Sequence, residues 1–138
     1  MAQENVEQLR HVYEALNEGA DEPLLDLLHP AFVYRTREEL PGGGTYRRHD
    51  FLRRLAELRQ TFREGRFEVE GFIASGQDVV VAVRVSGLGR VSGVPVDERM
   101  FHAWTIENAK ALELRIYSDR GDALQAAGLS EQDAHADS

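Results

Sequence analysis

Residues 67–85 read Phe67-Glu68-Val69-Glu70-Gly71-Phe72-Ile73-Ala74-Ser75-Gly76-Gln77-Asp78-Val79-Val80-Val81-Ala82-Val83-Arg84-Val85 and carry the clearest structural pattern of the chain. Side chains of opposite polarity alternate from Phe67 to Ile73, and a period of two is typical of a half-buried strand. Ala74-Ser75-Gly76 supplies a turn, with glycine where a left-handed backbone is needed. From Val79 to Val85, every second residue is a valine on one face. The segment therefore predicts a hairpin of two long strands.

Two further strands are expected downstream, at about 94–106 and 111–118, after a glycine-rich turn near 87–93. If Asn108-Ala109 is a two-residue turn, antiparallel pairing places Ala103 beside Leu114 and Phe101 beside Ile116. This register predicts an apolar face made of Phe101, Ala103, Leu112, Leu114 and Ile116. The opposite face then holds Met100, His102, Trp104, Arg115 and Tyr117.

Upstream of the hairpin the apolar period is helical. Apolar residues at intervals of three and four predict a helix over 4–18, which Gly19 ends. A short helix over 22–28, with Asp21 as its cap, and a helix over 49–63 complete the N-terminal part. A first strand is expected over 32–36, and a loop over 40–46 because three glycines follow a proline. After the last strand, Asp119 caps a short helix over 120–127.

Length and composition limit the classes of function. The chain has 138 residues, a formal net charge of −8 and no cysteine. This length predicts one domain, residues 1–129, followed by an acidic flexible tail, 130–138. An acidic chain disfavours nucleic acid and anionic membranes as partners. The absence of cysteine excludes disulfides and thiolate chemistry. The N-terminus has no basic, apolar leader, which predicts a cytoplasmic location.

The chain resembles the NTF2-like superfamily, in its SnoaL-like, ketosteroid-isomerase-related branch. Three segments carry the resemblance, which spans residues 4–129: Tyr13 to Gly19 after the polar N-terminus, Leu40 to Tyr46 before a helix, and Phe101-His102-Ala103-Trp104-Thr105 before the last hairpin. It implies an α+β, cone-shaped fold with three N-terminal helices packed on a strongly curved, mostly antiparallel sheet, and a short C-terminal helix. It implies no single activity, because this fold hosts many reactions.

Ketosteroid isomerase chemistry requires particular side chains, whose positions can be compared with this sequence. It needs a carboxylate base and two oxyanion donors, a tyrosine and a protonated aspartic acid. Alignment on the first helix puts Val12 at the tyrosine position, next to Tyr13. The base position falls at Thr36 and the acid position at Phe101. None of the three groups is present, so ketosteroid isomerase activity is not expected.

His102 and Asp119 are the remaining candidates for catalysis. His102 titrates near neutrality in its ordinary state, and Asp119 could orient it. The register above turns His102 outward, beside Met100, Trp104, Arg115 and Tyr117, a set typical of interfaces, and so predicts a homodimer through that face. A surface histidine and an active-site histidine remain alternatives, and for Asp119 helix capping is the preferred explanation over catalysis. The histidines show no metal-binding spacing, so neither a metal nor a cofactor is expected.

The predicted interior is apolar with a few hydroxyl groups, which suits a small, largely apolar or polycyclic ligand. The leading hypothesis is a protein that binds such a molecule, with isomerase-like or cyclase-like activity left open. The alternative is a dimeric interaction domain without catalysis, whose cavity is incidental and filled by side chains. The predicted pocket consists of Tyr13, Phe32, Tyr34, Thr36, Tyr46, Leu55, Val83, Phe101, Ala103 and Ile116.

Overall fold

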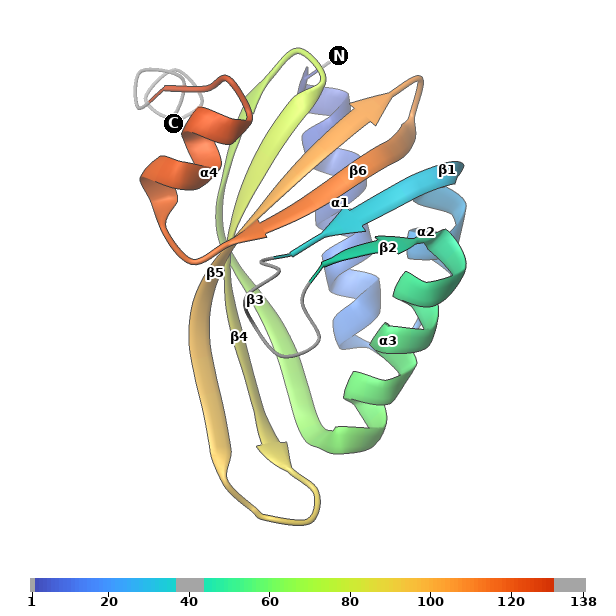
Figure 1. The fold of residues 1–138 in the computed structure, drawn as a ribbon, viewed down its shortest axis with the longest axis vertical. Helices are drawn as coiled ribbons and strands as arrows, with labels where there is room; N and C mark the ends of the chain where they lie inside the picture. The colour runs from blue at the N-terminus through green and yellow to red at the C-terminus, as the bar shows by residue number, and fades with distance from the viewer. Residues whose placement is uncertain (1, 37–43, 131–138) are drawn as a thin grey trace.

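The computed structural model describes residues 2–36 and 44–130, and it contains one mixed sheet of six strands (Figure 1). The strands follow the order β2-β1-β6-β5-β4-β3 across the sheet. Only the β1–β6 pair is parallel among the described strands; the other four pairs are antiparallel. The strands are β1 Leu28–Arg35, β2 Thr45–Arg47, β3 Phe62–Ser75, β4 Asp78–Gly89, β5 Pro95–Glu107 and β6 Lys110–Tyr117.

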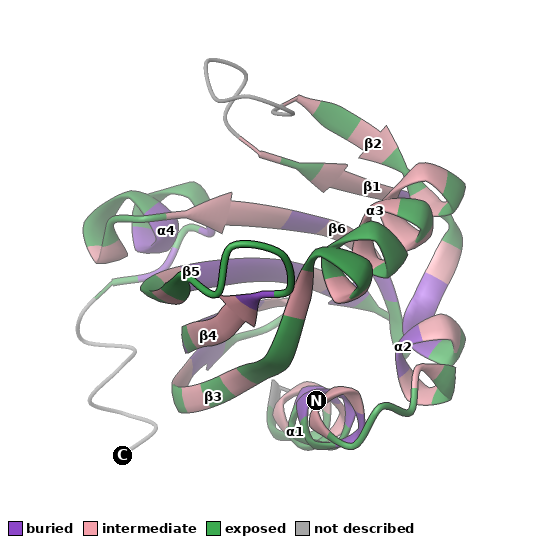
Figure 2. Ribbon diagram, turned by 90° about the horizontal axis from the view of Figure 1, so that it is seen from below, coloured by how far each residue is buried: buried purple, intermediate pink, exposed green. Residues whose placement is uncertain are grey.

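Four helices cover the two faces of this sheet. They are α1 Ala2–Asn17, α2 Glu22–Leu27, α3 Arg48–Thr61 and α4 Arg120–Ala126. Figures 1 and 2 show α1 and α3 on one side of the long strands and α4 on the other. We call the side that faces α1 and α3 the inner face, and the side that faces α4 the outer face. The predicted α+β architecture, with N-terminal helices on a mostly antiparallel sheet and a short C-terminal helix, is confirmed.

The side chains of strand β4 point alternately into two hydrophobic clusters, one on each face of the sheet. Val79, Val81 and Val83 belong to the inner cluster, together with residues of α1 and α2. Val80 and Ala82 belong to the outer cluster, under α4. Because both faces of β4 are covered, its side chains from Val79 to Val83 are all buried. A strand that is covered on both faces has a continuous apolar run, as this one does.

The predicted register between β5 and β6 is wrong by one residue. The two-residue turn is confirmed, because Glu107 pairs with Lys110 and both turn residues, Asn108 and Ala109, have positive φ. The pairing then shifts, with Ile106 opposite Ala111 but Thr105 opposite Glu113. The residue left over is a β-bulge on β6, and a bulge reverses the face of every later pair. Beyond it the pairs are Trp104 with Leu114, His102 with Ile116, Ala103 with Arg115 and Phe101 with Tyr117.

Smaller differences concern the ends of elements. Strand β1 begins at Leu28 and contains Pro30, whereas the predicted strand began at residue 32. Strand β2 begins within the predicted 40–46 loop and extends one residue beyond it. Residues 40–43 of that loop lie outside the described chain, as do residues 131–138 of the predicted tail. Asp21 precedes α2 without a side-chain cap, and instead forms an ion pair with Arg59 on α3 at 2.6 Å.

One side chain fixes α1 against the edge of the sheet. The Asn17 amide accepts a hydrogen bond from the Phe67 backbone N–H and donates one to its carbonyl, each at 2.8 Å. This pair satisfies both backbone groups of a residue on edge strand β3. The helix is therefore held against the inner face, where its buried side chains Leu9, Val12 and Tyr13 belong to the inner cluster.

Candidate functional site

A buried polar group lies on the inner face, where α1 crosses strand β5. Tyr13 from α1 and His102 and Trp104 from β5 are 3%, 7% and 3% exposed. The Tyr13 hydroxyl lies 2.6 Å from His102 Nδ1, and the Trp104 indole N–H donates to the same hydroxyl oxygen at 3.1 Å. His102 and Trp104 share a face because they are two residues apart on one strand. We refer to these three residues as the polar trio.

Burial keeps the polar trio uncharged. It lowers the pKa of His102 to about 4, because the imidazolium would lose its hydration. Burial also raises the pKa of the Tyr13 hydroxyl, an effect that the hydrogen bond from Trp104 offsets only in part. At neutral pH the imidazole and the phenol are therefore both neutral.

The surroundings of the trio are apolar. The Phe67 ring meets Tyr13 edge-on at 6.2 Å between ring centroids and meets His102 at 6.5 Å. Val81 and Ile116 flank His102 on the neighbouring strands. The inner cluster also carries apolar side chains that are only partly buried: Val6, Leu16, Tyr34, Phe51, Leu52, Leu55, Phe67, Val69, Phe72, Val85 and Ile116.

A second aromatic group joins β1 and β2 to α3. Phe51 on α3 contacts Tyr34 at 4.9 Å and Phe32 at 5.2 Å between ring centroids. Tyr46 on β2 lies 5.9 Å from Tyr34, and the Arg54 guanidinium sits 5.4 Å from the Tyr46 ring centroid. Burial raises the pKa of Tyr34, and the neighbouring positive charge of Arg54 opposes this. Two phenol groups therefore accompany the apolar lining at this end.

The structure brings together six of the ten predicted pocket residues and separates two. Phe101 and Ala103 lie on the outer face, in the cluster under α4, so their placement in the interior was wrong. The reason is the bulge, which exchanges the faces of β5 relative to β6. Thr36 donates its backbone N–H to Gly44 at the end of β1, and Tyr46 contacts Tyr34. The six that belong to or pack against the inner cluster are Tyr13, Phe32, Tyr34, Leu55, Val83 and Ile116.

The same reversal corrects the predicted dimer face. His102 and Trp104 were expected outward, yet both are buried against α1 in a single chain. Met100 lies opposite Val83, which is on the inner face as well. Arg115 and Tyr117 lie on the other side, opposite Ala103 and Phe101. The five residues therefore do not form one surface.

The isomerase positions also shift by one residue. Val12 is buried in the inner cluster and Phe101 in the outer cluster, and neither offers a hydrogen bond. Their chain neighbours Tyr13 and His102 are the residues that meet inside. Tyr13 stands next to the predicted tyrosine position in the sequence, but nothing in the residue pattern indicated that His102 turns inward to meet it.

Asp119, the other catalytic candidate, caps α4. Its carboxylate accepts a hydrogen bond from the Asp122 backbone N–H at 2.9 Å, as the predicted cap requires. The hydrogen-bond partner of His102 is Tyr13, not this carboxylate. Asp119 therefore has a structural explanation, and the trio has no acidic member.

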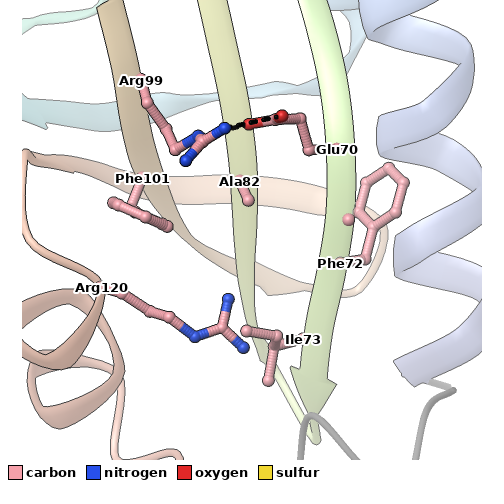
Figure 3. Close-up of a pocket in the computed structure, with 8 residues that line it drawn as sticks. Glu70, Phe72, Ile73, Ala82, Arg99, Phe101 and Arg120 are labelled. Atoms are coloured by element: carbon pink, nitrogen blue, oxygen red, sulfur yellow. Dashed lines mark hydrogen bonds and ion pairs between the residues drawn. The ribbon is translucent and has the colours of Figure 1, made fainter.

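A hollow on the outer face was not expected from the sequence. It has a volume of about 430 Å³, and Ile73, Ala82 and Phe101 contribute apolar side chains to its wall (Figure 3). Figure 3 shows Arg99 joined to Glu70 at one end, with a closest approach of 2.7 Å, and Arg120 reaching toward Ile73 from the other end. The hollow is separated from the polar trio by the sheet.

Within 2–36 and 44–130, no group of three or more His, Asp or Glu side chains is arranged to hold a metal ion. In the same segments, no helix combines the length and apolarity needed to cross a membrane.

Comparison with known proteins places these features in context. A model of the SnoaL-like domain matches residues 9–114. An NTF2-like protein of unknown function from Burkholderia pseudomallei is 23% identical, with a TM-score of 0.74 over 89% of this chain and 96% of that chain. TerC, crystallised with polyporic acid, is also 23% identical, with a TM-score of 0.72 and the same coverage.

A third structure, of a proposed SnoaL-like polyketide cyclase from Jannaschia, is 19% identical and has a TM-score of 0.71 over 94% of both chains. A comparison with curated proteins gives no match. At these identities the three structures establish the fold, which is the NTF2-like fold that the sequence resemblance implied.

Proposed function

Because the chain belongs to the SnoaL-like domain family and carries a buried polar trio on the inner face of its sheet, we propose that it binds a small, largely apolar molecule between that face and α3. The binding residues are the partly buried apolar side chains of the inner cluster, with the trio at their deep end. The proposal concerns binding, since the carboxylate base of an isomerase is absent.

The incomplete burial of α3 is the observation that carries this proposal. Phe51, Leu52 and Leu55 pack against the inner cluster, yet α3 has no fully buried residue. A helix of a globular domain normally buries its apolar stripe. Across from α3, Phe67 and Val85 on β3 and β4 are likewise only partly buried. When a ligand covers two such half-exposed apolar surfaces, the complex is stabilised by roughly 25 cal/mol for each Å² of apolar surface that is buried.

The chemistry of the lining favours a flat, neutral molecule. Aromatic side chains from β1, β2, β3 and α3 can stack on a ring system. A protein of the same fold has been crystallised with polyporic acid, which supports a search among polycyclic compounds. The candidate ligands are therefore aromatic polyketides, steroids and terpenes.

Thermal unfolding with such a panel of compounds tests the proposal. A ligand at 100 times its Kd stabilises the folded state by about 2.7 kcal/mol, since it does not bind the unfolded chain. For a domain of this size that corresponds to a rise in Tm of roughly 8 °C. We expect a saturable rise with at least one compound, and its absence across the panel would contradict the proposal.

Two neighbouring residues of β4 provide a matched pair of variants. Val85 faces the inner cluster and Ser86 faces the other side, and both are half-buried. Val85→Gln places a polar amide among the proposed ligand contacts and should abolish the rise in Tm. Ser86→Gln adds the same group on the outer face and should leave the rise intact. If the ligand raises the Tm of both variants equally, or of neither, binding at the inner face is contradicted.

A further inference from the structure

The hydrogen bonds of the polar trio determine which nitrogen of His102 carries its proton. An indole N–H can only donate, so the Tyr13 oxygen accepts from Trp104. The Tyr13 hydroxyl hydrogen then needs an acceptor of its own, and among the described residues only His102 Nδ1, at 2.6 Å, offers one. Nδ1 therefore bears a lone pair, and a neutral imidazole of this kind carries its hydrogen on Nε2.

The opposite assignment is unfavourable. If Nδ1 carried the hydrogen and donated to Tyr13, the buried hydroxyl hydrogen would have no acceptor in the described part of the chain. A buried donor without a partner costs the free energy of its lost hydration. The doubly protonated ring is excluded at neutral pH because burial lowers the pKa of His102 to about 4.

The remaining donor, Nε2–H, has no hydrogen-bond partner among the described residues, although His102 is 93% buried, being 7% exposed. A small part of the His102 surface stays exposed, beside apolar side chains that include Phe67. The imidazole ring is nearly buried and is held in place by the hydrogen bond at Nδ1. The described residues supply no acceptor for its Nε2–H donor.

We propose that the ligand of the inner face presents a neutral carbonyl oxygen to His102 Nε2–H. This inference rests on the proposed function and narrows it to aromatic or conjugated ketones and quinones. A carboxylate is disfavoured, because a buried anion needs a compensating charge and the trio is neutral. A hydroxyl that could only donate would leave the Nε2 hydrogen unbonded. Tyr13 and Trp104 act as positioning residues, since they hold the imidazole in the tautomer that donates.

A matched pair of probes tests this inference: fluorene, a flat hydrocarbon, and fluorenone, the same ring system with one carbonyl group. Binding is followed by quenching of the fluorescence of Trp104, the single tryptophan of the chain. A hydrogen bond of ordinary net strength changes affinity about fivefold to tenfold. We expect fluorenone to bind more tightly than fluorene by about that factor.

Two substitutions of His102 test the Nε2–H donor separately from the rest of the imidazole ring. His102→Asn keeps an acceptor near the position of Nδ1 for the Tyr13 hydroxyl but has no group at Nε2, so it should reduce the affinity for fluorenone to that for fluorene. His102→Gln places an amide N–H near Nε2 and should keep part of the preference. Measured Tm values show that each variant is folded.

The outcomes distinguish this inference from the function on which it rests. If both probes bind the wild-type protein equally, or if His102→Asn weakens both to the same degree, the carbonyl assignment is wrong while ligand binding stands. If neither probe binds, the assignment and the proposed function both lose their support. The comparison of probes on the wild-type protein needs no variant to fold.

Discussion

Replacement of Trp104 by alanine should lower the free energy of unfolding by roughly 3–5 kcal/mol. The side chain is 3% exposed and packs with Phe32, at 6.4 Å between ring centroids, in the inner cluster. Its loss leaves a cavity between α1 and the sheet and removes the N–H donor to Tyr13. Urea unfolding followed by far-ultraviolet circular dichroism measures the change, because the variant has no tryptophan to report by fluorescence.

A surface residue of the same chain provides the control. Val91 is fully exposed in the turn between β4 and β5, and Val91→Ala should change the free energy of unfolding by less than about 0.5 kcal/mol. If Trp104 lay on an outer face, as the register predicted from sequence places it, Trp104→Ala would behave in the same way. A loss below about 1 kcal/mol would therefore contradict the inner placement of β5.

The second large effect is a dependence of stability on pH that comes from His102. Its pKa is about 4 in the folded chain and 6.5 in its ordinary state, so between these values the unfolded chain binds a proton that the folded chain does not. Stability then rises with pH and is lost as the pH falls from 6.5 toward 4. Between pH 7.5 and 4.5 the loss from this one group should be about 2.5 kcal/mol.

The contribution is isolated by comparison with His102→Asn, because carboxylates also titrate in this range. Urea unfolding at pH 7.5 and 4.5 should show a smaller loss in the variant than in the wild-type protein, by about 2.5 kcal/mol. His49→Asn, at an exposed position on α3, is the control and should lose as much as the wild-type protein. An equal loss in all three proteins would show that His102 is not buried as described.

The sequence predicted the elements well where one physical signal determined them. Gly76, with φ of 60°, lies in the turn of the β3–β4 hairpin as expected, although the turn is Gly76-Gln77 and the predicted turn residues Ala74 and Ser75 belong to β3. Asp119 caps α4 as predicted. The alternating valines of β4 correctly indicated a long strand. These features depend on backbone geometry and on periodicity, both of which act within a few residues along the chain.

The faces of β5 could not be predicted in the same way. Phe101 and Ala103 are apolar, and so are Met100 and Trp104, so either register buries apolar side chains. The choice depends on a bulge in β6 and on the hydrogen bonds that Tyr13 offers from a helix 89 residues away in sequence. A contact across that separation leaves no periodic signal, which is why the inward turn of His102 was missed.

The interior was predicted in composition but not in its polar chemistry. Phe32, Tyr34 and Leu55 were assigned to an apolar interior, and Phe32 belongs to the inner cluster while Tyr34 and Leu55 pack against it. The alternation of strands allowed that assignment without knowledge of any contact. The polar trio could not be predicted without a structure, because its hydrogen bonds depend on individual atoms rather than on residue types: which nitrogen of His102 accepts, and which carries the hydrogen.

Nitrogen-15 NMR of the histidine ring tests the central claim of this account most directly. Long-range proton–nitrogen spectra at pH 7 distinguish the two neutral tautomers, and the His102 signals are assigned by their loss in His102→Asn. We predict hydrogen on Nε2, a bare Nδ1, and no titration until the pH approaches about 4. A ring protonated on Nδ1, or one that titrates near its ordinary pKa of 6.5, would contradict the buried trio and the donor assigned to the ligand.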